Sequence, residues 1–371
     1  MNIEKVKVHL GERSYDIFAA PGLLSAGGTP NAALDALGRL TEKRPVLVVA
    51  DSHTAPLAAD KLRQLLLDLG AASCGIHVFE AGETSKDFRH VEAICRSAFQ
   101  AKLDRGGIIA ALGGGVTGDM AGFAASIYMR GIGCIQIPTS LLAMIDSSVG
   151  GKTGVDLPDG KNLIGTFHQP KLVLIDVDFL ATLPRDQIRS GLAELIKHAI
   201  LFDPELMQIL EEESENLLNL KDPALAARLI ARSCALKAAV VSGDERESSS
   251  RALLNLGHSF GHAVEKLQHY AGFSHGDAVG FGMAAAATLA VRLKLIKQAD
   301  AGRITDLLRR YELPVTVSGF TPNDIFEAMK GDKKNYSGKM RLILPVRIGR
   351  AVICEDAPED AVLAAIGEHC D

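Results

Sequence analysis

The sequence predicts an α/β domain with a mainly parallel sheet over residues 1–180 and an all-α domain over residues 181–371. Three observations lead to this fold class. The chain has 371 residues, which suits two domains better than one. Its first half alternates short aliphatic runs with segments of helical periodicity, the order that builds parallel sheets. From 194 to 310 the periodicity is helical only, and the crevice between two such domains is the usual place for an active site.

The expected elements follow from composition and periodicity. Runs of β-branched and aliphatic residues predict strands at 45–51, 75–79, 107–112, 134–137 and 172–176. In the first domain, helical periodicity predicts helices at 57–69 and 87–100. In the second domain, it predicts helices at 194–202, 205–218, 223–242, 259–267, 278–293 and 299–310.

Composition limits the partners and the compartment. Hydrophobic residues make up 47% of the chain and charged residues 23%, the balance of a globular protein. A net charge of −5 predicts no basic surface, so nucleic acid is not expected as a partner. The charged first 20 residues do not read as a secretory signal, and the apolar stretch 278–291 is too short to span a bilayer. Six scattered cysteines without a C-x-x-C pair indicate reduced thiols in a cytoplasmic protein.

A glycine-rich segment follows the predicted strand at 107–112. Gly113, Gly115 and Gly118 match G-x-G-x-x-G, in which bare glycines let backbone amides approach a pyrophosphate at a helix N-terminus. This pattern alone is a weak signal. Asp51, at the end of an earlier strand, is the better ribose-binding acid, which departs from the usual dinucleotide fold. An equally good interpretation makes Asp51 the cap of the following helix.

Three segments offer metal ligands. Glu194 and Lys197 share a helix face among apolar residues, as do His258 and His262, which are four residues apart. His275 lies in a predicted loop before an apolar helix. A glutamate with two histidines and an open position suits a catalytic zinc site, although any one histidine alone is more often structural. The spacing does not decide which of His258 and His262 is a ligand and which an acid–base group.

Cationic side chains indicate anion binding. The glycines of 146–165 preclude a long helix, which places Lys152 and Lys161 on loops where they can converge on a phosphate. Further cations are Arg130, Lys237, Arg251 and the turn at 332–334. A single lysine is more often a solvated surface charge. Lys237 and Arg251 are harder to dismiss, because each lies next to apolar residues.

Taken together, these segments resemble 3-dehydroquinate synthase over about residues 45 to 350. The resemblance is carried, in one order, by GETSK at 82–86, LGGGVTGD at 112–119, PTSLLA at 138–143, DSSVGGKT at 146–153, GKN at 160–162, AELIK at 193–197, LNLGHSFGH at 254–262, HGD at 275–277 and DKK at 332–334. It implies a dehydroquinate synthase-like fold, with a dinucleotide-binding first domain and a helical metal- and substrate-binding second domain.

The resemblance also implies roles for single residues. Glu194, His258 and His275 correspond to ligands of a divalent ion, zinc or cobalt, and His262 to an acid–base residue. The implied NAD contacts are Asp51, His53, Glu83, Lys86, Gly114, Gly115, Val116, Asp119, Thr139, Ser140, Lys161 and Thr182. The implied substrate contacts are Asp146, Lys152, Asn162, Lys197, Lys237, Arg251, Asn255 and either Lys334 or its neighbour Lys333. Arg130 corresponds to a phosphate contact from a neighbouring subunit, which implies a homodimer. Two positions depart from the family: His53 replaces the usual Asn, and Asp277 the usual Glu.

The implied reaction converts DAHP, a seven-carbon phosphorylated keto acid, to 3-dehydroquinate and phosphate in the shikimate pathway. It combines transient oxidation by NAD, phosphate elimination, reduction and aldol ring closure, with the metal acting as a Lewis acid. Lys152, Asn162, Arg130 and the 332–334 turn would hold the phosphate, and Arg251 the carboxylate. Alternatives are a related sugar-phosphate or aminoDAHP cyclase, a polyol dehydrogenase that needs neither Lys152 nor Arg251, and a binding protein without activity.

Overall fold

The computed structural model describes residues 2–25, 31–247, 250–269, 272–330 and 340–371. The chain divides into two compact units. The first consists of residues 1–183 and 222–246, and the second of residues 184–221 and 247–371. Residues 222–246 therefore belong to the first unit, whereas the sequence had assigned them to the second domain.

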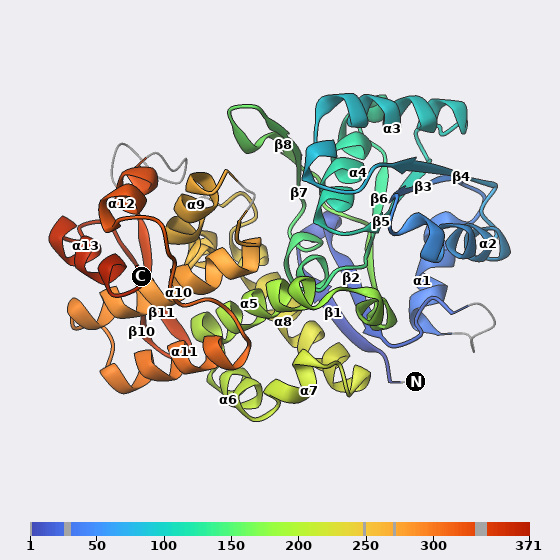
Figure 1. The fold of residues 1–371 in the computed structure, drawn as a ribbon. Helices are drawn as coiled ribbons and strands as arrows, with labels where there is room; N and C mark the ends of the chain where they lie inside the picture. Colours follow the sequence, from blue (N-terminus) through green and yellow to red (C-terminus); the bar gives the residue numbers. More distant parts are fainter. Residues whose placement is uncertain (1, 26–30, 248–249, 270–271, 331–339) are drawn as a thin grey trace. The chain divides into compact units, whose positions relative to one another are not determined.

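A seven-stranded sheet with the order β1-β2-β9-β6-β5-β3-β4 forms the centre of the first unit (Figure 1). Strands β1 and β2 pair antiparallel, and all the other neighbours pair parallel. The strands are β1 (Glu4–Val8), β2 (Tyr15–Ala20), β3 (Pro45–Asp51), β4 (Ser73–Phe79), β5 (Ile108–Gly113), β6 (Gly133–Pro138) and β9 (Leu172–Asp176). The predicted parallel sheet is thus confirmed, while β1 and β2 were not predicted.

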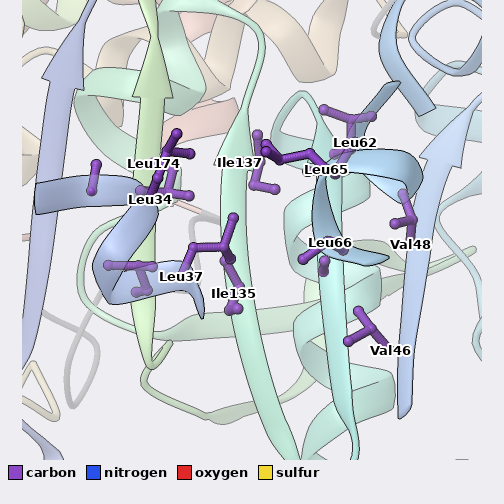
Figure 2. Close-up of a cluster of buried hydrophobic side chains, with 14 of the residues drawn as sticks. Leu34, Leu37, Val46, Val48, Leu62, Leu65, Leu66, Ile135, Ile137 and Leu174 are labelled. Atoms are coloured by element: carbon purple, nitrogen blue, oxygen red, sulfur yellow. The ribbon is translucent and has the colours of Figure 1, made fainter. Parts of the chain in front are cut away.

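Helices cover both faces of this sheet, which explains its continuous hydrophobic strands. The helices of the first unit are α1 (Ala32–Thr41), α2 (Asp60–Asp68), α3 (Phe88–Gln100), α4 (Gly115–Ile127) and α8 (Pro223–Gly243). Figure 2 shows leucines of α2 beside Val46 and Val48 of β3, and leucines of α1 beside Leu174 of β9 and Ile135 of β6. The alternate residues Leu47 and Val49 pack in a second cluster with α3 and α4. Helix α8 packs against β1 and β2.

A β-hairpin replaces the predicted loops at 146–165. Lys152 begins β7 (Lys152–Leu157), which pairs antiparallel with β8 (Gly160–Phe167). The segment contains no long helix, as predicted, but its glycines permit unusually close strands. A Cβ on Gly165 would lie 1.9 Å from the backbone oxygen of Thr153, and one on Gly154 would lie 2.4 Å from that of Ile164.

The second unit is predominantly helical. Its helices are α5 (Arg185–Phe202), α6 (Pro204–Glu212), α7 (Ser214–Leu218), α9 (His258–Leu267), α10 (His275–Arg292), α11 (Gln298–Arg310), α12 (Pro322–Lys330) and α13 (Glu359–Gly367). The expectation of an all-α domain needs one correction, because β10 (Leu342–Arg347) and β11 (Arg350–Cys354) form an antiparallel hairpin. Its turn contains Gly349 at φ +86°, a conformation that glycine adopts without strain. Within the described part of the chain, no helix is long and apolar enough to cross a membrane.

Helices α5 and α10 begin earlier than predicted, and both differences bear on the site. Helix α5 begins at Arg185, well before the predicted 194, so that Glu194 lies mid-helix. Helix α10 begins at His275, which the sequence had placed in a loop. Ser274 caps α10 by accepting from the amide of Asp277, whose carboxylate accepts from the Ser274 amide in return.

Candidate active site

Three helices of the second unit bring a glutamate and two histidines together. Glu194 lies on α5, His258 begins α9 and His275 begins α10. One ligand atom from each lies within 4.8 Å of the others. Oε1 of Glu194 is 3.7 Å from Nε2 of His258 and 3.9 Å from Nε2 of His275. The three side chains that the resemblance implies as metal ligands therefore converge.

The bonding of Glu194 fits a cation at this position. The residue is 1% exposed, and its Oε2 accepts a hydrogen bond from Lys197, which is equally buried. Its Oε1 is buried without a hydrogen-bond partner. Such an atom costs about 1–3 kcal/mol unless something satisfies it. A divalent ion shared with the two imidazoles would do so, and the donor set is one that zinc accepts.

His262 lies beside these three residues. Its ring centroid is 5.4 Å from that of His258 and 6.2 Å from that of His275. A second convergent group consists of His262, Glu265 and His275, without Glu194. Burial lowers the pKa of His275, but the carboxylates of Glu265 and Glu194 outweigh it, so the pKa lies above its ordinary value. Glu265 was not singled out from the sequence, although it lies seven residues after His258 on the same helix.

Glycines let α9 and α10 approach closely enough to pair the histidines. Gly257 precedes α9 in the left-handed region, at φ +79°. A Cβ on Gly282 of α10 would lie 1.9 Å from the backbone oxygen of Gly257, and one on Gly261 would lie 2.8 Å from that of Ala278. The ring centroids of His258 and His275 are consequently 5.3 Å apart.

We expect Gly282→Ala to lower the free energy of unfolding by about 1–3 kcal/mol, because the added methyl forces α9 and α10 apart. Zinc binding should weaken as well, since Gly257 adjoins His258. Denaturant titration of the metal-free protein and a zinc titration measure the two effects. Gly302→Ala in α11 is the matched control, because nothing lies within 4 Å of its added Cβ. The free energy of unfolding of this control should rise by about 0.5–1 kcal/mol, because alanine favours the helix more than glycine does. Equal free energies of unfolding for the two variants would contradict the packing argument.

Asp277 serves the start of α10. Besides capping with Ser274, its carboxylate accepts from Arg189 of α5 at 3.2 Å. Arg189 also donates to the backbone oxygen of Glu312 at 3.0 Å. Asp277 thus holds the helix turn that carries His275.

The second unit also contains two of the predicted substrate contacts. Arg251 and Asn255 lie on a short 3₁₀ helix, Ser250–Asn255. Arg251 is 2% exposed, and Asn255 donates to Glu247 at 3.2 Å. Lys333 and Lys334 fall outside the described residues.

In the first unit, the glycine-rich segment links β5 to α4. Gly114 is the N-cap of α4, and Gly115 is its first residue. A Cβ on Gly113 would collide with Thr117 at 2.3 Å and one on Gly118 with Gln136 at 2.7 Å, so packing requires these two glycines. The neighbours of Gly114 and Gly115 are more distant, at 3.4 and 3.3 Å. The first backbone amides of α4 therefore lie next to glycines that carry no side chain. This lets a phosphate group approach the amides at the helix N-terminus.

Asp51 bonds both to the turn that follows β3 and to the glycine-rich segment. Its Oδ1 accepts from the amides of His53 and Thr54, at 3.0 and 2.9 Å, which closes the turn after β3, while the residue that begins the next helical turn is Thr54. Its Oδ2 accepts from Thr117 of α4 at 3.0 Å, which ties the end of β3 to the glycine-rich segment. His53 is exposed.

A buried lysine organises the next group of predicted cofactor contacts. Nζ of Lys86 donates to Asp119 at 2.7 Å and to Asn162 at 2.6 Å. Burial opposes the charge of Lys86, but Asp119 and Glu83 outweigh it and raise its pKa. Burial raises the pKa of Asp119 although Lys86 acts against it. Nζ of Lys161 lies 3.7 Å from Oε1 of Glu83.

The remaining first-unit residues differ in exposure. Lys237 of α8 is buried and donates to the Asp146 carboxylate at 2.8 Å. Lys152 and Arg130 are exposed. Thr139 is buried, while Ser140 and Val116 are half-buried. Thr182 is exposed, and its hydroxyl donates to Phe179 of its own 3₁₀ turn.

Comparisons with known proteins agree over nearly the whole chain. The family models for the N-terminal and C-terminal parts of 3-dehydroquinate synthase match residues 76–190 and 191–335. A 3-dehydroquinate synthase from Pelotomaculum thermopropionicum is 46% identical over 95% of this chain and 93% of its own. One from Symbiobacterium thermophilum is 43% identical, covering 96% and 98%. The solved 2-epi-5-epi-valiolone synthase from Streptomyces hygroscopicus subsp. jinggangensis, with NAD+ and Zn2+ bound, has a TM-score of 0.85 and 32% identity, covering 96% and 97%.

Proposed function

Because this chain belongs to the 3-dehydroquinate synthase family, we propose that it converts DAHP to 3-dehydroquinate and inorganic phosphate. The step that expels phosphate breaks a carbon–oxygen bond and removes a proton from the adjacent carbon, which makes the enzyme a carbon–oxygen lyase. The observation that carries the proposal is the convergence of Glu194, His258 and His275, with Oε1 of Glu194 lacking a hydrogen-bond partner.

The cofactors are NAD and a divalent ion, zinc or cobalt. When bound, NAD supplies reversible hydride transfer, and the ion supplies Lewis-acid polarisation of a substrate hydroxyl. The described residues fit both groups. The amides at the start of α4 and the carboxylate of Asp51 suit the dinucleotide. The relative solved with NAD+ and Zn2+ bound supports this assignment.

The residues of the chain hold the two anionic ends of the substrate. Lys152 and Asn162, from β7 and β8, present a cation and an amide to the phosphate. Arg251 presents a guanidinium fork to the carboxylate. His262, next to His258 and His275, serves as the acid–base group.

The direct test is incubation with DAHP, NAD and zinc, with the product identified by mass spectrometry. We expect 3-dehydroquinate and one phosphate per substrate consumed. AminoDAHP, offered in parallel, should turn over much more slowly. Faster turnover of aminoDAHP would assign the protein to that related cyclase. An oxidised product that retains its phosphate would indicate a polyol dehydrogenase.

The active enzyme is a homodimer in which Arg130 contributes to the neighbouring phosphate site. Arg130 is exposed and held in a left-handed backbone at φ +68°, directly after Met129 at φ +49°. Apolar side chains beside it are also exposed, 43% for Ile127 and 41% for Met129, and contact with a second subunit would remove this apolar surface from water.

Mixing inactive Arg130→Ala with inactive Lys152→Ala should restore part of the activity. A hybrid dimer then contains one site with both cations intact, so up to about a quarter of the wild-type rate is expected under free exchange. Subunit exchange is verified separately with labelled chains. Exchange without recovery would show that Arg130 acts within its own chain.

The location that fits this enzyme is the cytoplasm. All six cysteines are free thiols. Free thiols are typical of proteins in reducing compartments.

A further inference from the structure

Glu265 is a buried acid that the proposed chemistry does not use. It lies on α9 and is 6% exposed. Its Oε1 is 3.5 Å from Nδ1 of His275. Burying a carboxylate costs desolvation free energy unless a hydrogen-bond or ion-pair partner offsets it. The neighbouring imidazole of His275 is such a partner for Glu265.

The two nitrogens of the His275 ring face different carboxylates. Nδ1 faces Glu265, and Nε2 faces Oε1 of Glu194 at 3.9 Å. A neutral imidazole carries one proton, and Glu265 is the nearer acceptor, at 3.5 Å from Nδ1 against 3.9 Å between Glu194 and Nε2. The proton therefore belongs on Nδ1, which leaves the lone pair of Nε2 directed toward Glu194.

The same arrangement occurs at His258. Its Nδ1 lies 3.1 Å from the backbone oxygen of Leu256, and its Nε2 lies 3.7 Å from Oε1 of Glu194. Each histidine thus has an acceptor at Nδ1 and presents Nε2 to the same glutamate oxygen. Outer acceptors of this kind fix the tautomer and orientation of metal-binding histidines.

We propose that Glu265 is a positioning residue, which holds His275 as the Nδ1–H tautomer so that Nε2 coordinates the metal. The inference rests on the proposed metal site. Glu265 could instead be a ligand itself, within the group His262, Glu265 and His275. The geometry favours positioning, because Glu265 faces Nδ1, and Nδ1 lies on the side of the ring opposite the Nε2 that faces Glu194.

Zinc affinity of the metal-free protein tests the proposal without an activity assay. Competition with a fluorescent chelator should show Glu265→Ala binding zinc about 10- to 100-fold more weakly than wild type. Glu265→Gln should lose clearly less zinc affinity, because the amide oxygen of the glutamine still accepts a hydrogen bond from Nδ1–H of His275. Val264→Ala is the control, since it removes the neighbouring buried side chain of α9 and should leave zinc affinity within about twofold.

The tautomer gives a second readout that a general loss of packing would not change. Two-bond ¹H–¹⁵N spectra of the metal-free protein, recorded where the ring is neutral, should show His275 protonated at Nδ1 in wild type and Val264→Ala. In Glu265→Ala the proton should move toward Nε2. Unchanged zinc affinity and tautomer in both Glu265 variants would overturn the inference and leave the metal site standing. An equal and severe loss of zinc affinity in Glu265→Gln and Glu265→Ala, together with a loss of zinc affinity in His262→Ala, would show that Glu265 is itself a ligand. Absence of zinc binding by wild type would instead refute the proposed function.

Discussion

Glu194→Gln, His258→Ala and His275→Ala will each bind zinc at least about 100-fold more weakly than wild type and lose activity. His262→Ala will lose activity but keep its metal. The reason is geometric, since Oε1 of Glu194 faces Nε2 of both His258 and His275. Loss of a direct ligand should exceed the 10- to 100-fold effect typical of an outer partner.

Metal content after dialysis and zinc competition measure this result. A chelator should abolish turnover of the wild type, and added zinc or cobalt should restore it. His269→Ala is the matched control, because this exposed histidine follows the end of α9. If His262→Ala lost the metal while His258→Ala retained it, the roles of the two histidines would have to be exchanged.

The second large effect concerns the cofactor balance. With trace NAD and excess DAHP, many equivalents of phosphate should appear per NAD, without a lasting rise in NADH absorbance. The hydride removed in the oxidation returns in the later reduction, so NAD is required but not consumed. One NADH accumulating per substrate, with the phosphate still attached, would exclude the cyclase and favour a polyol dehydrogenase.

Arg251→Ala should lower kcat/KM by on the order of 30- to 1,000-fold, which corresponds to about 2–4 kcal/mol for loss of one partner of a buried charge pair. NAD affinity should change little, because a dinucleotide site has no need of this cation. Arg251 is 2% exposed, so Arg251→Lys keeps the test valid if the alanine variant does not fold. Arg350→Ala, at an exposed position on β11, is the control. Equal losses of kcat/KM in Arg251→Ala and Arg350→Ala would refute the assignment of Arg251 to the substrate carboxylate.

The sequence predicted the central sheet well, for a physical reason. Val46 to Val49 are buried alternately in the two clusters on opposite faces, so β3 reads as a continuous apolar run. The hairpin β7–β8 escaped prediction because glycines weaken strand signals, although here the pair Gly154 and Gly165 permits close approach.

The site residues were found through motifs, but their contacts required the fold. Spacing could not separate His258 from His262, because both project from one helix face. His275 looked like a loop residue, since the Ser274 cap that starts α10 was not taken into account. Glu265 carries no motif of its own, and its relation to His275 arises only when α9 packs on α10.

The assignment of α8 to the first unit has a consequence for synthesis. The chain leaves that unit after residue 183 and returns for residues 222–246. The last strand of the seven-stranded sheet, β9, ends at Asp176, and the helix that packs on β1 and β2 ends at Gly243, so the ribosome completes the strands 67 residues before it finishes that helix. At about 5–20 residues per second, the apolar surface of those strands awaits its partner for several seconds. A nascent chain stalled near residue 200 should therefore recruit chaperones more strongly than one stalled beyond residue 290.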